Sequence, residues 1–433
     1  MRTDAGGSGQ EIQQNTANMD QTSASRRAAV TICSLNYVPK ATVLLQSYHA
    51  HHPEDSLYLL IVDRRQEQFQ SDSIPAKIIW ADELGIDDFL QKAFCFDVIE
   101  FNTNVKPFIL RKLLQKHRQV LYLDPDICVY APLTPVFEAL ESASVVVTPH
   151  ANTPVLDGHV PDDVGFLRFG AYNLGFVGVS NCVEAEAFLD WWGARCMKLG
   201  YYEPQSGLAV DQKWVDLAPA FFPNLRILHD PGLNLAFWNM HERRISTSAG
   251  RHLVNNSHPL YFIHFSSFNE NSPEVIANKQ TRFAPGSRAD FQALAESYAA
   301  NLRAASRGES WPTGYGFDRF DDGVPVTPTL RRVYAALQSE MFPDANPFDA
   351  KSAVRQYAQR RKLLNKSGQP SKRLTFKDAG RFDRYERFVF VLLRLALRLL
   401  GPDRYFALMR YMSHISSIRN QAGVFREHHT PLS

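Results

Sequence analysis

Short apolar strand patterns alternate with helical patterns from Ala28 to about Phe283, and this alternation constrains the fold more than any other feature. AAVTICS (28–34) and SLYLLIVD (56–63) have the length and β-branched content of buried strands. Between them, KATVLLQSYHAHHP spaces its apolar residues as a helix does. Repetition of this order predicts an α/β fold, with a mostly parallel sheet flanked by helices.

The same patterns also predict how the chain is divided. Further strands are expected at 76–84, 119–126, 143–149, 173–180 and 259–267, and helices at 105–117 and 183–200. From about Phe283 onward the strands give way to helical patterns, separated by a Lys-, Ser- and Asn-rich linker at 361–380. We therefore expect a disordered leader (1–27), a catalytic domain (28–285) and a C-terminal helical region (286–433).

Charge and cysteine content exclude several classes of protein. The net charge of +2 over 433 residues is unlike that of a dedicated nucleic-acid binder. Five cysteines without close pairs indicate reduced thiols and a cytoplasmic protein, with no zinc cage. The segment 1–27 lacks the apolar core of a signal peptide, and the apolar run 388–400 is interrupted by two arginines and is too short to span a bilayer.

Two carboxylates follow a buried strand in VLYLDPDICVY (120–130). Residues i and i+2 of a strand point to one side, so Asp124 and Asp126 are expected to face a common point. Ligands of parallel sheets bind at the carboxyl ends of strands, and paired carboxylates suit Mg²⁺ or Mn²⁺. The alternative is that Asp-Pro-Asp only turns the chain; the apolar residues on both sides favour a metal site.

Seven segments carry a resemblance to a known family. In order they are ICSLNYV, VKPFILRKLL, VLYLDPDICVY, GAYNLGFVGV, AVDQKW, PGLNLAFWNM and YFIHFSS, within residues 28–285. The chain resembles GT-A-fold glycosyltransferases, most closely the family 8 group of glycogenin and bacterial galactosyl- and glucosyltransferases. The resemblance implies metal-dependent transfer of a sugar from a nucleoside-diphosphate sugar, with UDP favoured, to a glycan, glycolipid or protein acceptor in surface polysaccharide or glycoconjugate synthesis.

The resemblance also implies a role for individual residues. Asp124, Asp126 and His264 would bind the metal, and the imidazole shifts the expected ion from Mg²⁺ to Mn²⁺. The donor would contact Asn36, Tyr37, Lys106, Asp124 and Gly175, while Asn173, Asp211 and Gln212 would lie at the transferred sugar. Lys106 could instead be a surface lysine at a helix start, and Asp211 a helix N-cap.

The sequence departs from the family pattern after the metal histidine. The family has Gly three residues later and Lys six residues later, where this chain has Ser267 and Glu270. Lys279 is the available substitute for the lysine that contacts the leaving phosphate. The family implies retention of configuration; an inverting enzyme would need a base, and Asp211 and Asp230 are both candidates.

Two other hypotheses compete with a glycosyltransferase. An aspartyl-nucleophile phosphatase also uses DxD after a buried strand, and DDG at 321–323 could supply its late acidic pair. A non-catalytic sugar-nucleotide or glycan binder would explain the missing lysine.

The C-terminal tail is basic, while the rest of the chain is acidic. From Lys351 onward lie 18 of the 47 lysines and arginines but only 5 of the 45 acidic residues. The pattern of residues 381–419 predicts two Arg-rich apolar helices broken at Gly401 and Pro402, which could contact an anionic membrane peripherally. Docking on the acidic body is the alternative that we favour, because apolar residues surround most of 386–400.

Overall fold

A computed structural model of the chain describes residues 26–66, 69, 74–307, 311–312, 314–365, 368 and 383–426, with only the backbone at 383–386. Most of the predicted leader and most of the predicted linker at 361–380 lie outside the described residues.

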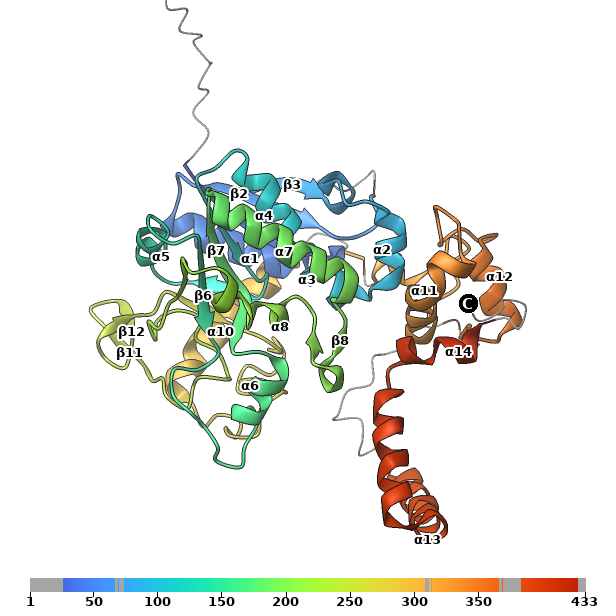
Figure 1. Ribbon diagram of the computed structural model, residues 1–433. Coiled ribbons are helices and arrows are strands. Elements are labelled where there is room, and N and C mark those ends of the chain that lie inside the picture. Colours follow the sequence, from blue (N-terminus) through green and yellow to red (C-terminus); the bar gives the residue numbers. More distant parts are fainter. Residues whose placement is uncertain are drawn as a thin grey trace, which may run out of the picture.

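A seven-stranded sheet forms the centre of the molecule (Figure 1). Its order is β10 (Leu225–Ile227), β6 (Val145–Pro149), β7 (Tyr172–Ser180), β4 (Gln119–Leu123), β1 (Arg27–Cys33), β2 (Ser56–Ile61) and β3 (Lys77–Trp80). Neighbours are parallel except at β7, which runs antiparallel to both β4 and β6. The predicted mostly parallel α/β sheet is confirmed, and the start of β7 lies where β4 and β6 end.

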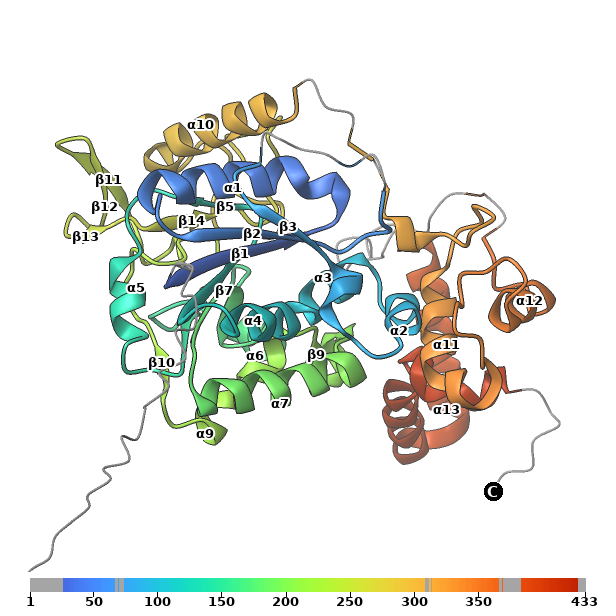
Figure 2. The ribbon, with the colours of Figure 1, turned by 90° about the horizontal axis from the view of Figure 1, so that it is seen from above.

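Helices cover both faces of the sheet, as Figure 2 shows. One face is covered by α1 (Val38–His51), with α10 (Ala289–Ala305) outside it, and the other by α4 (Lys106–Leu114) and α7 (Val183–Leu199). Strand residues divide between these faces by alternation: Ala28 and Val30 pack with Ile109 of α4, while Ala29 packs with Leu44 of α1. Both faces are therefore buried, which explains the continuous apolar strand runs.

Apart from α11, the remaining described α-helices and strands up to residue 360 are short. The helices are α2 (Phe89–Cys95), α3 (Val98–Asn104), α5 (Thr134–Ala139), α6 (Asp163–Phe169), α8 (Gln212–Val215), α9 (Ala218–Phe221), α11 (Pro328–Met341) and α12 (Ala353–Arg360). The small strands are β5 (Ile127–Val129), β8 (Tyr202–Glu203), β9 (Leu208–Ala209), β11 (Ile245–Ser248), β12 (Arg251–Val254), β13 (His258–Pro259) and β14 (Phe262–His264).

The strand predicted at 259–267 does not join the central sheet. Its core, β14, pairs antiparallel with β5, and this register sets His264 opposite Ile127. Because β5 begins directly after Asp126, the pairing brings His264 to the Asp-Pro-Asp turn.

The C-terminal helices share cores with the sheet. Phe291 and Tyr298 of α10 pack in one cluster with Val43 of α1, and Tyr334 of α11 belongs to the cluster that includes Val30 of β1. The limits 28–285 for a catalytic domain stay a prediction.

The tail helix α13 (Asp383–His414) projects away from the body (Figure 1). Gly401, at φ 76°, interrupts it before Pro402, which confirms the predicted break. The expected docking of 386–400 is wrong, since Phe388 is 62% exposed and Leu399 is 75% exposed. None of the described helices is long and apolar enough to cross a membrane.

The segment that docks on the body instead follows α13. Ser417 Oγ donates to Glu203 at 2.9 Å, and Arg419 makes two hydrogen bonds to the same carboxylate, at 2.7 and 3.2 Å. Arg332 of α11 pairs with Glu203 at 3.1 Å, and Phe425 packs against the core cluster that includes α11. We call the contacts of Ser417 and Arg419 with Glu203 the clasp. Burial alone would raise the pKa of Glu203, but its hydrogen bonds with Arg419 and Ser417 outweigh that effect and lower it.

We expect Glu203→Gln to detach the clasp. Loss of a hydrogen-bonded, mostly buried charge costs about 2 kcal/mol, so hydrogen exchange over 415–425 should accelerate about 30-fold. Because the pKa of Glu203 is lowered on folding, wild-type protection should be constant above the ordinary glutamate pKa of 4.5 and fall as the pH drops below it. Glu340→Gln, which removes an exposed pair with Arg426, is the control and should leave exchange unchanged. Equal effects of the two variants would contradict the clasp.

Candidate functional site

Three predicted metal ligands converge at one edge of the sheet. The ligand atoms of Asp124, Asp126 and His264 all lie within 4.8 Å of one another. His264 Nε2 is 3.0 Å from Asp126 Oδ1 and 3.6 Å from Asp124 Oδ2. Ligands about 2.1 Å from an ion and at right angles to each other are about 3 Å apart, so these separations fit a divalent ion. The imidazole is buried, and both carboxylates are partly accessible.

The two carboxylates converge through a turn and not through strand alternation. Asp124 follows the last residue of β4, Pro125 and Asp126 lie in the turn, and β5 begins at Ile127. The Ile127 N–H donates to the Asp124 carbonyl at 3.0 Å and closes the turn. The turn and metal interpretations are therefore compatible, because the turn is what gathers the ligands.

Lys106 lies beneath the carboxylates. Its ammonium is 3.0 Å from Asp211 and 3.7 Å from Asp124, and it donates to the Leu174 carbonyl at 2.8 Å. It also lies 4.6 Å from the centre of the Tyr122 ring, whose hydroxyl donates to Asp124. The side chain is only 2% exposed, so the interpretation of Lys106 as a surface lysine is wrong.

Asp211 is buried beside this ammonium. It precedes α8, but its side chain makes no capping hydrogen bond, so the N-cap interpretation is wrong. Burial raises its pKa to about 6, although Lys106 acts in the opposite direction. The preceding residue, Val210, has φ 49°, which is rare for a β-branched side chain and is typical of strained functional sites.

The charges of this cluster are unbalanced in a way that suits a cation. Its buried and partly buried groups are the carboxylates of Asp124, Asp126 and Asp211 against the ammonium of Lys106. Burial alone would raise the pKa of Asp126, but His264 outweighs this effect and lowers it. Burial would likewise lower the pKa of His264, but Asp126 raises it. Metal binding requires a neutral imidazole, and in that state the excess of two negative charges equals the charge of one divalent ion.

The start of β7 closes the cluster from the other side. At Gly175, a Cβ atom would lie 2.8 Å from Asp124 Oδ2 and would also collide with His264. Asn173 Oδ1 accepts from Gly175 N at 3.2 Å and from Asn234 Nδ2 at 3.1 Å. Glycine is therefore required at 175 for the ligands themselves, a reason that the sequence did not suggest.

Gln212 joins β7 to the end of α6. Its Oε1 accepts from Leu174 N at 3.0 Å, and its Nε2 donates to the Phe169 carbonyl at 3.0 Å. Hydrogen bonds to the backbone therefore fix the orientation of the Gln212 amide at the border of the cluster.

Asn36 and Tyr37 lie at the end of the neighbouring strand β1, and both are exposed. Sequence reasoning missed Asp63, which holds their turn: its carboxylate accepts from Leu35 N at 3.1 Å and from Gly316 N at 2.7 Å. Asp63 thereby ties the predicted nucleotide-binding turn to the C-terminal region. Its only signal in the sequence was its position after a strand.

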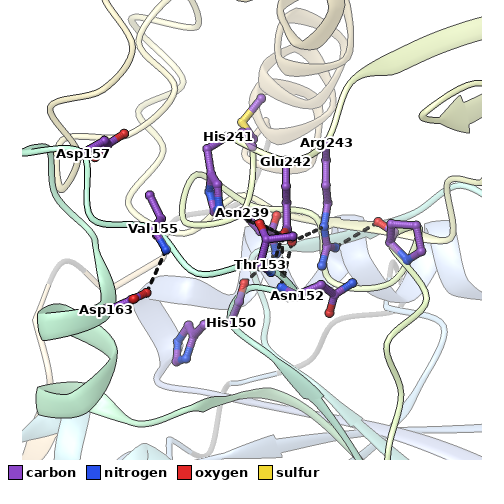
Figure 3. A network of polar contacts seen from close by, with 12 residues as sticks. His150, Asn152, Thr153, Val155, Asp157, Asp163, Asn239, His241, Glu242 and Arg243 are labelled. Atoms are coloured by element: carbon purple, nitrogen blue, oxygen red, sulfur yellow. Dashed lines mark hydrogen bonds and ion pairs between the residues drawn. The ribbon is translucent and has the colours of Figure 1, made fainter.

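The loop after β6 is anchored by a second network that the sequence did not indicate (Figure 3). The Glu242 carboxylate accepts from Asn152 N at 2.9 Å and from both the N–H and the hydroxyl of Thr153, at 2.7 and 2.6 Å. Asn239 Nδ2 donates to the His150 carbonyl at 3.0 Å. Asn239 of the motif PGLNLAFWNM (231–240), together with Glu242 just after it, thus holds this loop in place.

The departures from the family pattern have different structural consequences. Ser267 adopts φ 59°, a left-handed conformation that favours glycine, so the backbone shape fits the family glycine although the side chain differs. Glu270 uses its carbonyl to accept from Arg303 at 3.1 Å. Lys279 is exposed.

The acidic residues of the phosphatase hypothesis and the second candidate base all have other partners. Asp321 pairs with Arg64 at 2.6 Å and Asp322 with Arg355 at 3.0 Å, which removes the observation that favoured a phosphatase. Asp230 accepts from Gly232 N at 2.8 Å within its own turn and faces His258 at 3.7 Å. Of the two candidate bases, Asp211 is the one in contact with the cluster.

The chain is distantly similar to several known proteins. No protein-family model matches the chain. Two uncharacterized proteins of Bacillus subtilis (strain 168) are similar to it: YfnF, 28% identical over 48% of this chain and 68% of its own, and YfnD, 25% identical over 55% of this chain and 76% of its own. Among solved structures, the glycosyltransferase GlyE of Streptococcus pneumoniae TIGR4 matches with a TM-score of 0.39 and 17% identity, over 65% of this chain and 63% of that one. The galactosyltransferase LgtC, solved with donor and acceptor sugar analogues, matches with a TM-score of 0.38 and 14% identity, over 65% and 98%.

We expect Gly175→Ala to weaken Mn²⁺ binding at least tenfold, because the new methyl group would displace His264 or Asp124. Isothermal calorimetry with MnCl₂ and a thermal melt measure the two effects separately. Gly165→Ala is the matched control: its Cβ has only ordinary contacts beyond 3.5 Å in α6, so Mn²⁺ binding should stay at the wild-type value, and stability should be unchanged or slightly higher because Ala favours a helix over Gly. Wild-type Mn²⁺ affinity in Gly175→Ala would contradict the site.

Proposed function

We propose that this protein is a metal-dependent glycosyltransferase of the GT-A type, similar to family 8, which moves a sugar from a nucleoside-diphosphate sugar to an acceptor hydroxyl. The observation that carries the proposal is the convergence of Asp124 and Asp126, in the turn after β4, with His264 at the end of β14. The order of the sequence motifs supports the same assignment.

The ligand set suits Mn²⁺, because an imidazole accompanies the two carboxylates. Mg²⁺ is the alternative ion. When bound, such an ion acts as a Lewis acid that neutralises charge on the departing diphosphate. The chain's own residues have separate tasks: Asp124, Asp126 and His264 would bind the ion, while Asn36 and Tyr37 would contact the base and ribose.

In the reaction, the bond between the anomeric carbon and the diphosphate oxygen breaks, and the diphosphate takes the electron pair. The acceptor oxygen forms the new bond, and its proton passes to the departing diphosphate oxygen. We propose that Asp211, Asn173 and Gln212 line the sugar pocket, with Lys106 holding the Asp211 carboxylate in place. The hexose and the retaining outcome follow the resemblance, and Lys279 is proposed to substitute for the missing lysine.

The proposed acceptor is a glycan, a lipid-linked glycan or a protein, in surface polysaccharide or glycoconjugate synthesis. The proposed compartment is the cytoplasm, at the inner face of a membrane that residues 381–419 contact peripherally. The free cysteines, most of them buried, support a reducing environment.

A screen of radiolabelled nucleotide sugars tests the activity. With Mn²⁺ we expect transfer or slow hydrolysis of one donor, and we expect EDTA, Asp124→Ala, Asp126→Ala or His264→Ala to reduce the rate at least 100-fold. These variants should remain folded, because the ligands contribute little to the core. Full activity in EDTA or in Asp126→Ala would refute the metal claim, and release of phosphate from simple esters would favour a phosphatase. Donor binding without any turnover would favour the non-catalytic binder.

We expect UDP to bind more tightly than GDP or TDP in the presence of Mn²⁺, from the match at Asn36 and Tyr37. Calorimetric titration of the three diphosphates measures the order directly. Asn36→Ala should reduce the preference, whereas the exposed Asn420→Ala, in the C-terminal segment, should leave it unchanged. Tighter binding of GDP than of UDP would overturn the assignment.

A further inference from the structure

The two halves of α13 carry the largest group of exposed apolar side chains in the described part of the chain. The group comprises Phe388, Val389, Phe390, Val391, Leu392, Leu395, Leu397, Leu399, Leu400, Phe406, Tyr411 and Met412, each at least 37% exposed. Figure 1 shows this helix below the body and apart from the sheet and its covering helices. Apolar surface of this extent indicates a partner.

The charges on α13 identify the chemistry of that partner. Residues 383–414, which form α13, contain six arginines and three acidic residues, Asp383, Glu386 and Asp403, and so carry an excess of three positive charges. In the first half, Arg394 and Arg398 follow Arg387 by seven and eleven residues, so at 3.6 residues per turn all three lie within about 20° of one line along the helix. In the second half, Arg410 and His414 follow Asp403 by the same seven and eleven residues, so these three side chains also lie along one line of the helix.

A narrow basic stripe on an otherwise apolar helix fits the boundary between lipid headgroups and acyl chains. A second copy of the chain fits less well, because each helix carries three more positive than negative charges, so packing two of them together would bring like charges near one another. No described helix can span the bilayer, so both halves would lie in its plane.

The clasp determines how the body is attached to this helix. Ser417 and Arg419 lie three and five positions after the end of α13 and are bound to Glu203, whose carboxylate also pairs with Arg332 of α11. We infer that α13 binds the surface of an anionic phospholipid bilayer in the interfacial plane, and that the clasp fixes the body at a set distance and orientation above it. This inference deepens the membrane contact of the proposed function, and its tests do not require transfer activity.

Sedimentation of the full chain with vesicles tests the inference. We expect partition into vesicles of phosphatidylcholine and phosphatidylglycerol, mixed at about two to one, to exceed that into pure phosphatidylcholine at least tenfold, and to fall at high NaCl concentration. Each arginine near an anionic surface contributes about fivefold. The variant Arg387→Gln/Arg394→Gln/Arg398→Gln should therefore lose on the order of 100-fold in partition. The variant Phe388→Ser/Leu392→Ser/Leu399→Ser should lose binding to both kinds of vesicle.

The matched control removes three exposed positive charges from the body, in Lys116→Gln/Lys198→Gln/Arg226→Gln, and should partition within twofold of wild type. Thermal melts verify that every variant is folded. Equal partition of wild type into both kinds of vesicle, or an equal loss in the control, would overturn the inference. A dimer by light scattering that the serine variant converts to monomer would show that a second copy covers α13 instead.

The clasp is tested by fluorescence energy transfer between a donor label on the body and labelled lipid. The donor is attached at exposed position 198 in the variant Lys198→Cys, and wild-type protein is checked for reaction of the native cysteines with the label. Glu203→Gln should broaden the distance distribution while leaving partition within twofold. An unchanged distribution would contradict a fixed orientation. UDP binding measured on the same variants distinguishes the two proposals. If vesicle binding is intact but UDP does not bind, the proposed glycosyltransferase function is refuted and the membrane inference stands.

Discussion

One buried ammonium group, that of Lys106, connects the elements that form the site. It joins the start of α4 to β7 through the Leu174 carbonyl, to the segment before α8 through Asp211, and to the end of β4 through Asp124. A buried cation of this kind is tolerated only while its closest partner, Asp211 at 3.0 Å, stays in place, since removal of that carboxylate would leave an uncompensated charge at a cost of several kcal/mol. The position of the carboxylates is therefore coupled to the packing of the sheet and its helices, and is not a local property of the turn.

Much of the sheet, and the place of Asp124 and Asp126 at its edge, could be predicted from the sequence because both depend on local patterns. The apolar run before Asp124 is a strand in the structure, and the breaks at Asn36 and Gly401 are real. Pairing between distant segments could not be predicted in this way. The antiparallel pairing of β14 with β5, which brings His264 to Asp126, joins 262–264 to 127–129, two segments that lie far apart in the sequence.

Residues that act through backbone groups were the least predictable. Asp63 and Glu242 are ordinary acidic residues in the sequence. Only the fold shows that Asp63 accepts hydrogen bonds from the main chain of two other segments, and that Glu242 accepts them from a loop. For the tail, the prediction from the sequence was wrong. The apolar residues around 386–400 favoured burial against the body, but the segment that contacts the body is the short one after α13, in which Ser417 and Arg419 bind Glu203.

The loop between β6 and β7 leaves the sheet and returns to it at the same edge. Pro149 pairs with Tyr172, and the His150 N–H donates to the Ala171 carbonyl at 2.8 Å, so the two ends of the loop are adjacent. A loop closed at its base can change in length at little cost, about 0.6 kcal/mol for each doubling. Insertions or deletions between His150 and Ala171 would reshape the surroundings of the cluster without altering the register of β7 or the spacing of Asp124, Asp126 and His264. This loop is thus the place where descendants of one ancestral sequence could diverge in what they recognise while their chemistry stays the same.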